Sequence, residues 1–365
     1  MKRKTKNRIA DVCRVVFGLT FVFSGFVKTV DPWGTAIKIT EYLNTYGFET
    51  LNNYRFGFAI WFCAAELMMG LMMIFKIKTR LISIFAVAVM VFFTILTFFS
   101  ATWMPVEDCG CFGDALQLPP WASFVKSVVL LALAVIVWLN ARRTLTFFPV
   151  SVKEWVCTVL FACIAGGIGA HCYYHLPLVD FLPYKKGVNL YDAIYHDEAA
   201  EQEVKLVCRD LRDGSLREFA VSDTTWYDTA RWEFVEQAAG GGFEADVALR
   251  EFAVFNSEGD ATRGIVGYPG RVYILSAVKI DKIKPRCAER FGRIADRAAG
   301  EDAKVVLITA SPISPGETAD FGGSVPVTLY NVDATTMITM LRATTGMVVL
   351  DGGVITDKRN CRDIR

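Results

Sequence analysis

Two cysteines one residue apart form the stretch of this chain that is richest in reactive side chains. Cys109 and Cys111 flank Gly110 in the sequence CGCFGD, here called the cysteine turn, which covers residues 109–114 between two long apolar runs. Such a dithiol can form a disulfide and exchange it with an incoming thiolate, or, if kept reduced, bind a metal ion. Thiols stay reduced in the cytosol and oxidise outside it. The side of the membrane on which the cysteine turn lies therefore decides whether disulfide exchange or metal binding is expected.

The composition predicts a membrane protein. The 365 residues are 53% hydrophobic and only 21% charged, which is too apolar for an ordinary soluble chain. About 20 residues in a helix cross the roughly 30 Å hydrocarbon core of a bilayer. Runs of this length occur at 9–30, 54–75, 81–103, 121–139 and 154–176. We therefore predict an all-α membrane bundle of four helices plus a fifth span. The first run exceeds the apolar stretch of a signal peptide, so we expect it to remain uncleaved.

Basic residues in the short loops predict the orientation of the spans. They precede the first run and join the second to the third and the fourth to the fifth, whereas the loop 104–120 has none. By the positive-inside rule the N-terminus is expected to be cytoplasmic, and the cysteine turn and everything after residue 176 exoplasmic. This describes a multi-pass protein of the bacterial inner membrane with a periplasmic C-terminal domain. The net charge of +1 argues against a nucleic-acid partner.

Ionisable side chains inside the spans are candidates for a polar site. Glu66 lies midway along the second run, where a charge costs about 2.5–3.5 kcal/mol, so it should face the bundle interior and find a partner or be protonated. Lys28 ends the first run and either joins this site or snorkels to the membrane rim. Lys126 has the same two alternatives. Asp114 either orients a thiol or simply forms the turn, and a structural hydrogen bond between helices remains an alternative for Glu66.

The state of the thiol pair is open at this stage. Gly110 permits backbone angles that a very small disulfide ring would need, and the strain of such a ring would favour exchange. A structural or reduced pair is the first alternative. A metal site with His171 and His175 is the second, but the HxxxH spacing lacks the Glu of a metalloprotease, and we predict no metal.

The part of the chain after the fifth run is expected to be soluble. Prolines and glycines suggest a linker at 177–201 and a domain at 202–365, after a membrane domain at 1–150 and a fifth helix at 151–176. We predict strands at 204–209, 216–221, 249–255, 271–277, 304–309, 325–330, 347–350 and 354–357, and helices at 282–299 and 334–342, the latter capped by Asp333. This order is typical of a thioredoxin-like α/β domain. A further amphipathic helix is expected near 37–48 on the outer membrane surface.

The predicted domain has no Cys-x-x-Cys where a thioredoxin carries one. The strand 271–277 is followed by a segment without a cysteine pair, and Cys287 is expected about two turns into the next helix. We therefore expect no thioredoxin chemistry in this domain.

Several motifs resemble a known family. FVFSGFVKTVDP, AAELMMGL and EDCGCFGDALQLP, between about residues 15 and 139, resemble the DoxX superfamily and its MauE-type branch, associated with methylamine utilisation. HLPLVDFLPYKKGVNL and TTGMVVLDGGVI resemble Bacteroidetes-type fusions of this unit to a thioredoxin-like domain, although Thr345 stands where thioredoxins have a proline. The resemblance implies disulfide formation in an exported enzyme and a link to quinone reduction, with Cys109 and Cys111 as the redox pair.

Taken with the residues, the resemblance leads to one expected function and one alternative. The expected function is thiol-disulfide exchange, or electron transfer toward a quinone, that assists maturation of exported proteins, with Lys28, Glu66 and Asp114 beside Cys109 and Cys111. The partners would be membrane lipid and an exported client or thiol protein; a quinone is the candidate cofactor. The alternative is a non-catalytic membrane scaffold with an exoplasmic binding domain. A small-solute transporter is disfavoured because no span is visibly broken.

Overall fold

The chain forms two compact units in the computed structural model. The structure describes residues 2–103, 110, 112–113, 118–141, 151–201, 205–212, 215–220, 231–238, 249 and 252–365. The membrane unit is Met1–Leu182 and the second unit is Pro183–Arg365. Each unit is described by itself.

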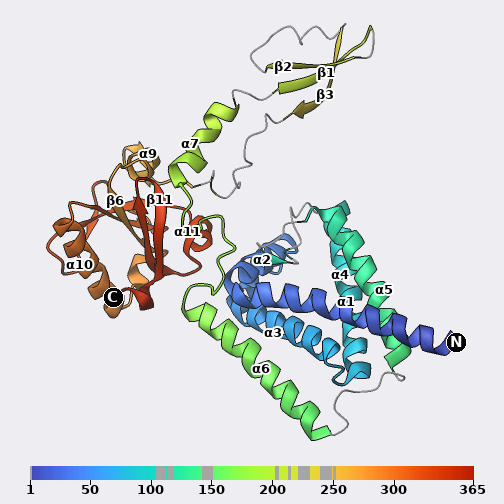
Figure 1. Ribbon diagram of the computed structural model, residues 1–365. Coiled ribbons are helices and arrows are strands. Elements are labelled where there is room, and N and C mark those ends of the chain that lie inside the picture. Colours follow the sequence, from blue (N-terminus) through green and yellow to red (C-terminus); the bar gives the residue numbers. More distant parts are fainter. Residues whose placement is uncertain are drawn as a thin grey trace. The chain divides into compact units, whose positions relative to one another are not determined.

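The membrane unit is built from long apolar helices (Figure 1). They are α1 (Lys2–Val30), α3 (Arg55–Ile74), α4 (Thr79–Thr102), α5 (Pro120–Asn140) and α6 (Ser151–Tyr174), with α2 (Pro32–Thr45) and the 3₁₀ helix η1 (Glu49–Tyr54) between α1 and α3. Five helices among the described residues are long and apolar enough to cross a membrane, which confirms the five predicted spans. Large apolar side chains such as Trp61, Phe92 and Leu139 are exposed on the unit, as lipid-facing positions would be.

Helices α1 and α3 pack with their backbones close together because glycines line the contact. A Cβ atom at Gly70 would lie 2.5 Å from the backbone nitrogen of Val22, and one at Gly25 would clash with Leu67. Small residues permit this approach in membranes, where helix association depends on packing more than on the hydrophobic effect. The α1–α3 contact is therefore fixed by residues that have no room for a side chain.

A buried arginine completes the same pair of helices. Arg14 of α1 is 4% exposed and donates to the carbonyl oxygens of Met73 and Ile74. These carbonyls belong to the last turn of α3, where intrahelical partners run out. Arg14 thus caps α3 with a neighbouring helix's side chain.

Helix α2 begins earlier than the predicted amphipathic segment 37–48. The Asp31 carboxylate accepts from the Gly34 backbone at 2.9 Å, and Pro32 occupies the first helical position. An Asp followed by Pro is a strong helix start, which the apolar spacing alone did not show. Trp33 is buried and its ring stacks on Tyr173 of α6 at 5.9 Å.

The second unit contains a mixed sheet of eight strands among its described residues, in the order β11-β10-β6-β7-β9-β4-β5, with β8 paired to β9. Strands β6, β7 and β9 are parallel, and β10 and β11 are antiparallel. The strands are β4 (Phe255–Asn256), β5 (Gly259–Asp260), β6 (Arg271–Ala277), β7 (Lys304–Thr309), β8 (Thr318–Ala319), β9 (Val327–Asn331), β10 (Thr345–Asp351) and β11 (Val354–Asn360).

Helices cover both faces of this sheet (Figure 1). Helix α10 (Pro285–Gly300) packs Phe291 and Ile294 into a core with Leu275, Leu307 and Met347. Helix α11 (Ala334–Leu341) lies on the other face and is capped by Asp333, as predicted. Shorter helices are α9 (Thr262–Val266), η5 (Ile280–Lys282) and η6 (Cys361–Asp363). A helical membrane part followed by an α/β domain is therefore confirmed.

The segment before this sheet has structure of its own. Helix α7 (Leu190–Glu201) lies in the stretch expected to be a linker, and β1 (Lys205–Asp210), β2 (Leu216–Ala220) and β3 (Trp232–Ala238) form an antiparallel sheet in the order β2-β1-β3. Trp232 packs there on Phe219 and the buried Cys208. The predicted strand 249–255 is wrong for the residues described in it: Leu249 is helical, and only Phe255 belongs to a strand.

The predicted position of Cys287 within its helix is also wrong. A separate 3₁₀ turn covers Ile280–Lys282, and α10 begins only at Pro285, so Cys287 lies in its first turn. Cys287 forms a disulfide with Cys361, with 5.8 Å between the Cα atoms. The two residues are 74 positions apart, so the sequence did not reveal the pairing. The bond ties α10 to the segment that follows β11 and should stabilise this unit by about 2–5 kcal/mol.

The chain entering the second unit runs along the open edge of β11. Gly187 donates its backbone N–H to the Ile355 carbonyl at 2.7 Å, and Ile355 donates to the Val188 carbonyl at 2.9 Å. These bonds cover a strand edge that would otherwise have unpaired groups.

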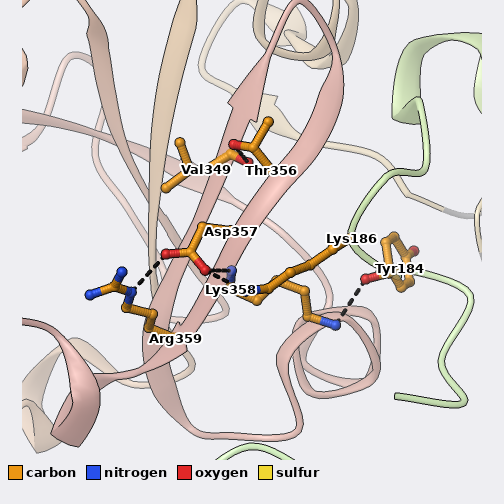
Figure 2. Close-up of polar contacts among 7 residues, drawn as sticks. All are labelled: Tyr184, Lys186, Val349, Thr356, Asp357, Lys358 and Arg359. Carbon is orange, nitrogen blue, oxygen red and sulfur yellow. Dashed lines mark hydrogen bonds and ion pairs between the residues drawn. The ribbon is translucent and has the colours of Figure 1, made fainter. Parts of the chain in front are cut away.

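Charged side chains reinforce this edge (Figure 2). The Asp357 carboxylate accepts from Lys186 Nζ at 2.6 Å and from Arg359 Nε at 2.7 Å. Buried Lys358 donates from Nζ to the Tyr184 carbonyl at 2.8 Å. Burial alone would raise the pKa of Asp357, but the hydrogen bonds and charges of Lys186 and Arg359 outweigh it and leave this pKa below its ordinary value.

Replacing Gly70 with alanine should destabilise the membrane unit, because the new methyl group would meet the backbone of α1. Overpacking of this kind costs about 1–3 kcal/mol. Gly57→Ala on the same helix is the matched control, since a Cβ there meets nothing within 4 Å. We expect a lower thermal midpoint in detergent for Gly70→Ala alone; equal midpoints would contradict the close packing.

The bonds of Asp357 with Lys186 and Arg359 should stabilise the second unit above about pH 4, the pKa of a free aspartate. This stabilisation should be lost as the pH falls further. The sign follows because the folded pKa is depressed, so the unfolded chain binds the proton more readily. The full chain is unfolded in urea at several pH values and then given a hydrogen-exchange pulse at one fixed pH. The urea midpoint read from peptides of β10 and β11 should be lower at pH 3 than at pH 5. In Asp357→Asn this fall should be smaller; an unchanged slope would refute the assignment.

Candidate functional site

A buried ion pair lies between two helices of the membrane unit. Lys28 Nζ on α1 is 2.8 Å from Glu66 Oε2 on α3, and the two side chains are 6% and 11% exposed. Lys28 therefore does not snorkel out of the bundle, and Glu66 faces the interior. Two charges withdrawn from water are tolerated only when they are paired with good geometry. Helices α1 and α3 approach closely at Gly25, three residues before Lys28, and this approach brings the two side chains together.

A small cavity opens beside this pair. It has a volume of about 30 Å³, and its lining includes both members of the pair, Lys126 of α5 and Phe112 of the cysteine turn. Hydroxyl-bearing residues from α1 and α5 complete the polar part of the wall: Thr20, Ser24 and Ser127. Such a space accommodates about one or two water molecules. Three ionisable groups from three helices thus converge on one small cavity.

Phe112 connects the cysteine turn to this cavity. Its side chain is 9% exposed, and its ring centroid lies 5.6 Å from that of Phe23 on α1. Lys126 Nζ lies 4.4 Å from the Phe112 ring centroid, within the range of a cation–π interaction. The aromatic ring therefore forms one wall of the charged site.

Two glycines fix the path of the turn. Gly110 and Gly113 have φ of +58° and +53°, which favour glycine. A Cβ at Gly110 would lie 3.2 Å from the Lys38 side chain of α2, and one at Gly113 would lie 3.3 Å from Val27 of α1. The described parts of the turn are thus packed against α1 and α2.

The remaining predicted site residues belong to the same turn. Cys109, Cys111 and Asp114 lie outside the described residues. Their neighbours Gly110 and Phe112 are described; Phe112 lines the cavity, and Gly110 lies against Lys38 of α2. Sequence reasoning missed Phe112, although an aromatic residue in a short turn between charged groups was a usable signal.

Neither His171 nor His175 lines this cavity. Their rings stack on each other at 4.9 Å, His171 in the last turn of α6 and His175 just after it. Within the described part of the chain, no three His, Cys, Asp or Glu residues are grouped so as to hold a metal ion. The four-ligand metal site weighed from the sequence would need Cys109 and Cys111, which lie outside that part.

Removing both members of the ion pair should destabilise the membrane unit by less than the sum of the two single changes. Lys28→Met leaves a buried carboxylate and Glu66→Gln leaves a buried ammonium, each of which is costly by about 3–5 kcal/mol. The double variant should lose at least about 1 kcal/mol less than the sum of the singles. Thermal midpoints in detergent measure this coupling, and additive losses would show that the two groups do not interact.

Comparison with known proteins bears on this same region. Residues 6–140 match the family model described as "Methylamine utilisation protein MauE". No curated protein and no solved structure matches the chain. The match supports a MauE-type membrane domain that spans α1 to α5 and includes Lys28, Glu66 and the cysteine turn, within a multi-pass membrane protein.

Proposed function

We propose that Cys109 and Cys111 exchange a disulfide with exported proteins and that the charged cavity lined by Phe112 serves this reaction. The observation that carries the proposal is the buried Lys28–Glu66 pair in a cavity whose wall includes Phe112, the residue after Cys111. Buried ionisable groups in a membrane bundle indicate function more often than stability. Their position next to a dithiol motif suggests proton and thiolate chemistry.

The reaction balances as two exchanges. A thiolate of the client attacks the Cys109–Cys111 disulfide, the sulfur–sulfur bond breaks, and one cysteine leaves as a thiolate. The second client thiolate then resolves the mixed disulfide, so the client is oxidised and the pair is reduced by two electrons. In this proposal the positive charges of Lys28 and Lys126 favour the thiolate form of the pair.

Reoxidation of the pair requires an acceptor of two electrons and two protons, for which we propose a quinone. Glu66 and Lys28 would carry the protons. A quinone ring is much larger than the cavity of about 30 Å³. Access would therefore require movement of lining side chains such as Phe112, Met90 or Phe93.

The proposed orientation places the cysteine turn and the second unit in the periplasm and the N-terminus in the cytosol. The basic residues of the loops favour this arrangement. The Cys287–Cys361 disulfide is a second argument from another part of the chain, because disulfides persist in oxidising compartments. It thereby supports a bacterial inner-membrane location.

In this proposal the second unit is a thioredoxin-like domain that holds the client. The parallel β6–α10–β7 unit followed by the antiparallel β10–β11 hairpin supports that likeness. At the start of α10, Lys284 stands where a first cysteine would be needed for Cys-x-x-Cys, and Cys287 is bonded to Cys361. These features favour binding over catalysis there. They equally motivate the alternative, a membrane scaffold without redox chemistry.

Replacing Cys109 and Cys111 with serine should abolish exchange and leave folding intact. Cys208→Ser is the matched control, because this free thiol is buried in the second unit. A single Cys111→Ala variant should accumulate a mixed disulfide with a client, visible as a mass shift that reduction removes. After mild reduction, a membrane-impermeant thiol reagent should label the pair from outside intact cells.

Two results would remove the redox proposal. One is a thiol pair that stays in a single state in growing cells, which favours the scaffold. The other is an unchanged thiol state of exported proteins in the double serine variant.

A further inference from the structure

A row of arginines follows one face of α10. Arg286, Arg290, Arg293 and Arg297 are spaced by four, three and four residues, which places them along one side of a helix. Their charges are not balanced by an equal row of acids on this face. The pattern is separate from the cysteine turn and from the charged cavity of the membrane unit.

Two adjoining cavities lie along this row. The first has a volume of about 560 Å³ and is lined by Arg290 and Arg293 of α10 and by Arg362, Asp363, Ile364 and Arg365 of the segment after β11. The second, of about 250 Å³, shares Ile364 and Arg365 with the first and continues along α10 to Arg297. Together they form the arginine cleft. Helix α10 and the segment 362–365 line the first cavity, and residues of β6, β10 and β11, among them Arg271, Arg359, Asp351 and Asp357, complete the second.

The guanidinium groups of the cleft differ in how they are engaged. Arg290 donates to the Cys361 carbonyl at 2.6 Å, and Arg359 pairs with Asp357 at 2.7 Å. By contrast, the guanidinium groups of Arg293 and Arg297 make no hydrogen bond or salt bridge with any described residue, and both side chains are exposed. Arg297 lies near Glu301, and its positive charge helps to hold the pKa of that carboxyl below its ordinary value.

The disulfide holds this cleft together. Cys287 in the first turn of α10 is bonded to Cys361, the residue just before the opposite wall, 362–365. The wall is thus fixed covalently to the helix that carries the arginine row. A preformed site loses less conformational entropy when it binds a ligand.

The chemistry of the cleft specifies its ligand. Arginine binds carboxylates through two parallel hydrogen bonds, which lysine cannot reproduce. Arg290 and Arg297 are about 10 Å apart along the helix axis at 1.5 Å per residue, too far for one anion. Alternate residues of an extended peptide are about 7 Å apart, so two or three acidic side chains match the row.

We propose that the arginine cleft binds an extended acidic segment of a partner protein, with carboxylates at alternate positions. This rests on the proposed role of the second unit as the part that holds a client, and it names the class of client. Binding of this segment involves no thiol reaction. The binding experiment can therefore fail while disulfide exchange is observed, and exchange can fail while binding is observed.

The test is binding of a labelled peptide to the full chain in an uncharged detergent. The probe has about ten residues, with glutamate alternating with leucine or serine, and binding is read by fluorescence anisotropy. Arg293→Glu and Arg297→Glu should each weaken binding by about fivefold or more, and the double variant further. Arg286→Glu is the matched control, because it makes the same charge change on the same helix but does not line the cleft. Raising the salt from about 50 to 300 mM should also weaken binding of the unaltered chain.

Four outcomes would overturn the proposal. Equal weakening by Arg286→Glu would indicate non-specific attraction by net charge. Equal binding of a lysine-substituted peptide would exclude charge recognition. Displacement by inorganic pyrophosphate at the peptide's own concentration would indicate a small-anion site. Binding of anionic vesicles in preference to the peptide, lost in the same two variants, would indicate a lipid surface instead.

Discussion

The membrane unit depends on one costly interaction, the ion pair between Lys28 and Glu66. Neither charge is stable alone in a hydrocarbon environment, so each requires the other at hydrogen-bond distance. That requirement fixes the register of α1 against α3, and the glycines at the contact allow the helices to come close enough to meet it. Apolar residues could pack the same helices at lower cost. Packing alone therefore does not account for the two charges.

The position of the cysteine turn follows from the same site. Lys126 brings a third charge into the cavity, and the Phe112 ring lies over it. A cation that faces an aromatic ring is better stabilised than one against aliphatic groups alone. This contact attaches the turn to the bundle at Phe112. It brings Phe112 and the ionisable cluster together, although Phe112 is far in sequence from Lys28 and Glu66.

Periodicity and capping predicted the regular elements, but contacts between distant residues needed the structure. The five spans were predicted from apolar length, β6 and β7 from compact apolar runs, and the start of α11 from Asp333, because these signals are local. The disulfide of Cys287 and the wall formed by Phe112 are not local. The start of α10 was misplaced because the 3₁₀ turn before it continues the helical spacing, and only Pro285 marks the boundary.

The charged side chains of the membrane unit are buried and paired, whereas several of those in the second unit are exposed to water. In the membrane unit, the buried Lys28 and Arg14 each meet an acceptor, because an unmet charge there would be severely destabilising. In the second unit, water stabilises exposed guanidinium groups, so Arg293 and Arg297 cost little without a salt bridge to any described residue. Their alignment along one helix is then not a requirement of folding. Arg290 of the same row bonds to the wall that the disulfide fixes, so the proposed binding would use arginines beside a preformed wall.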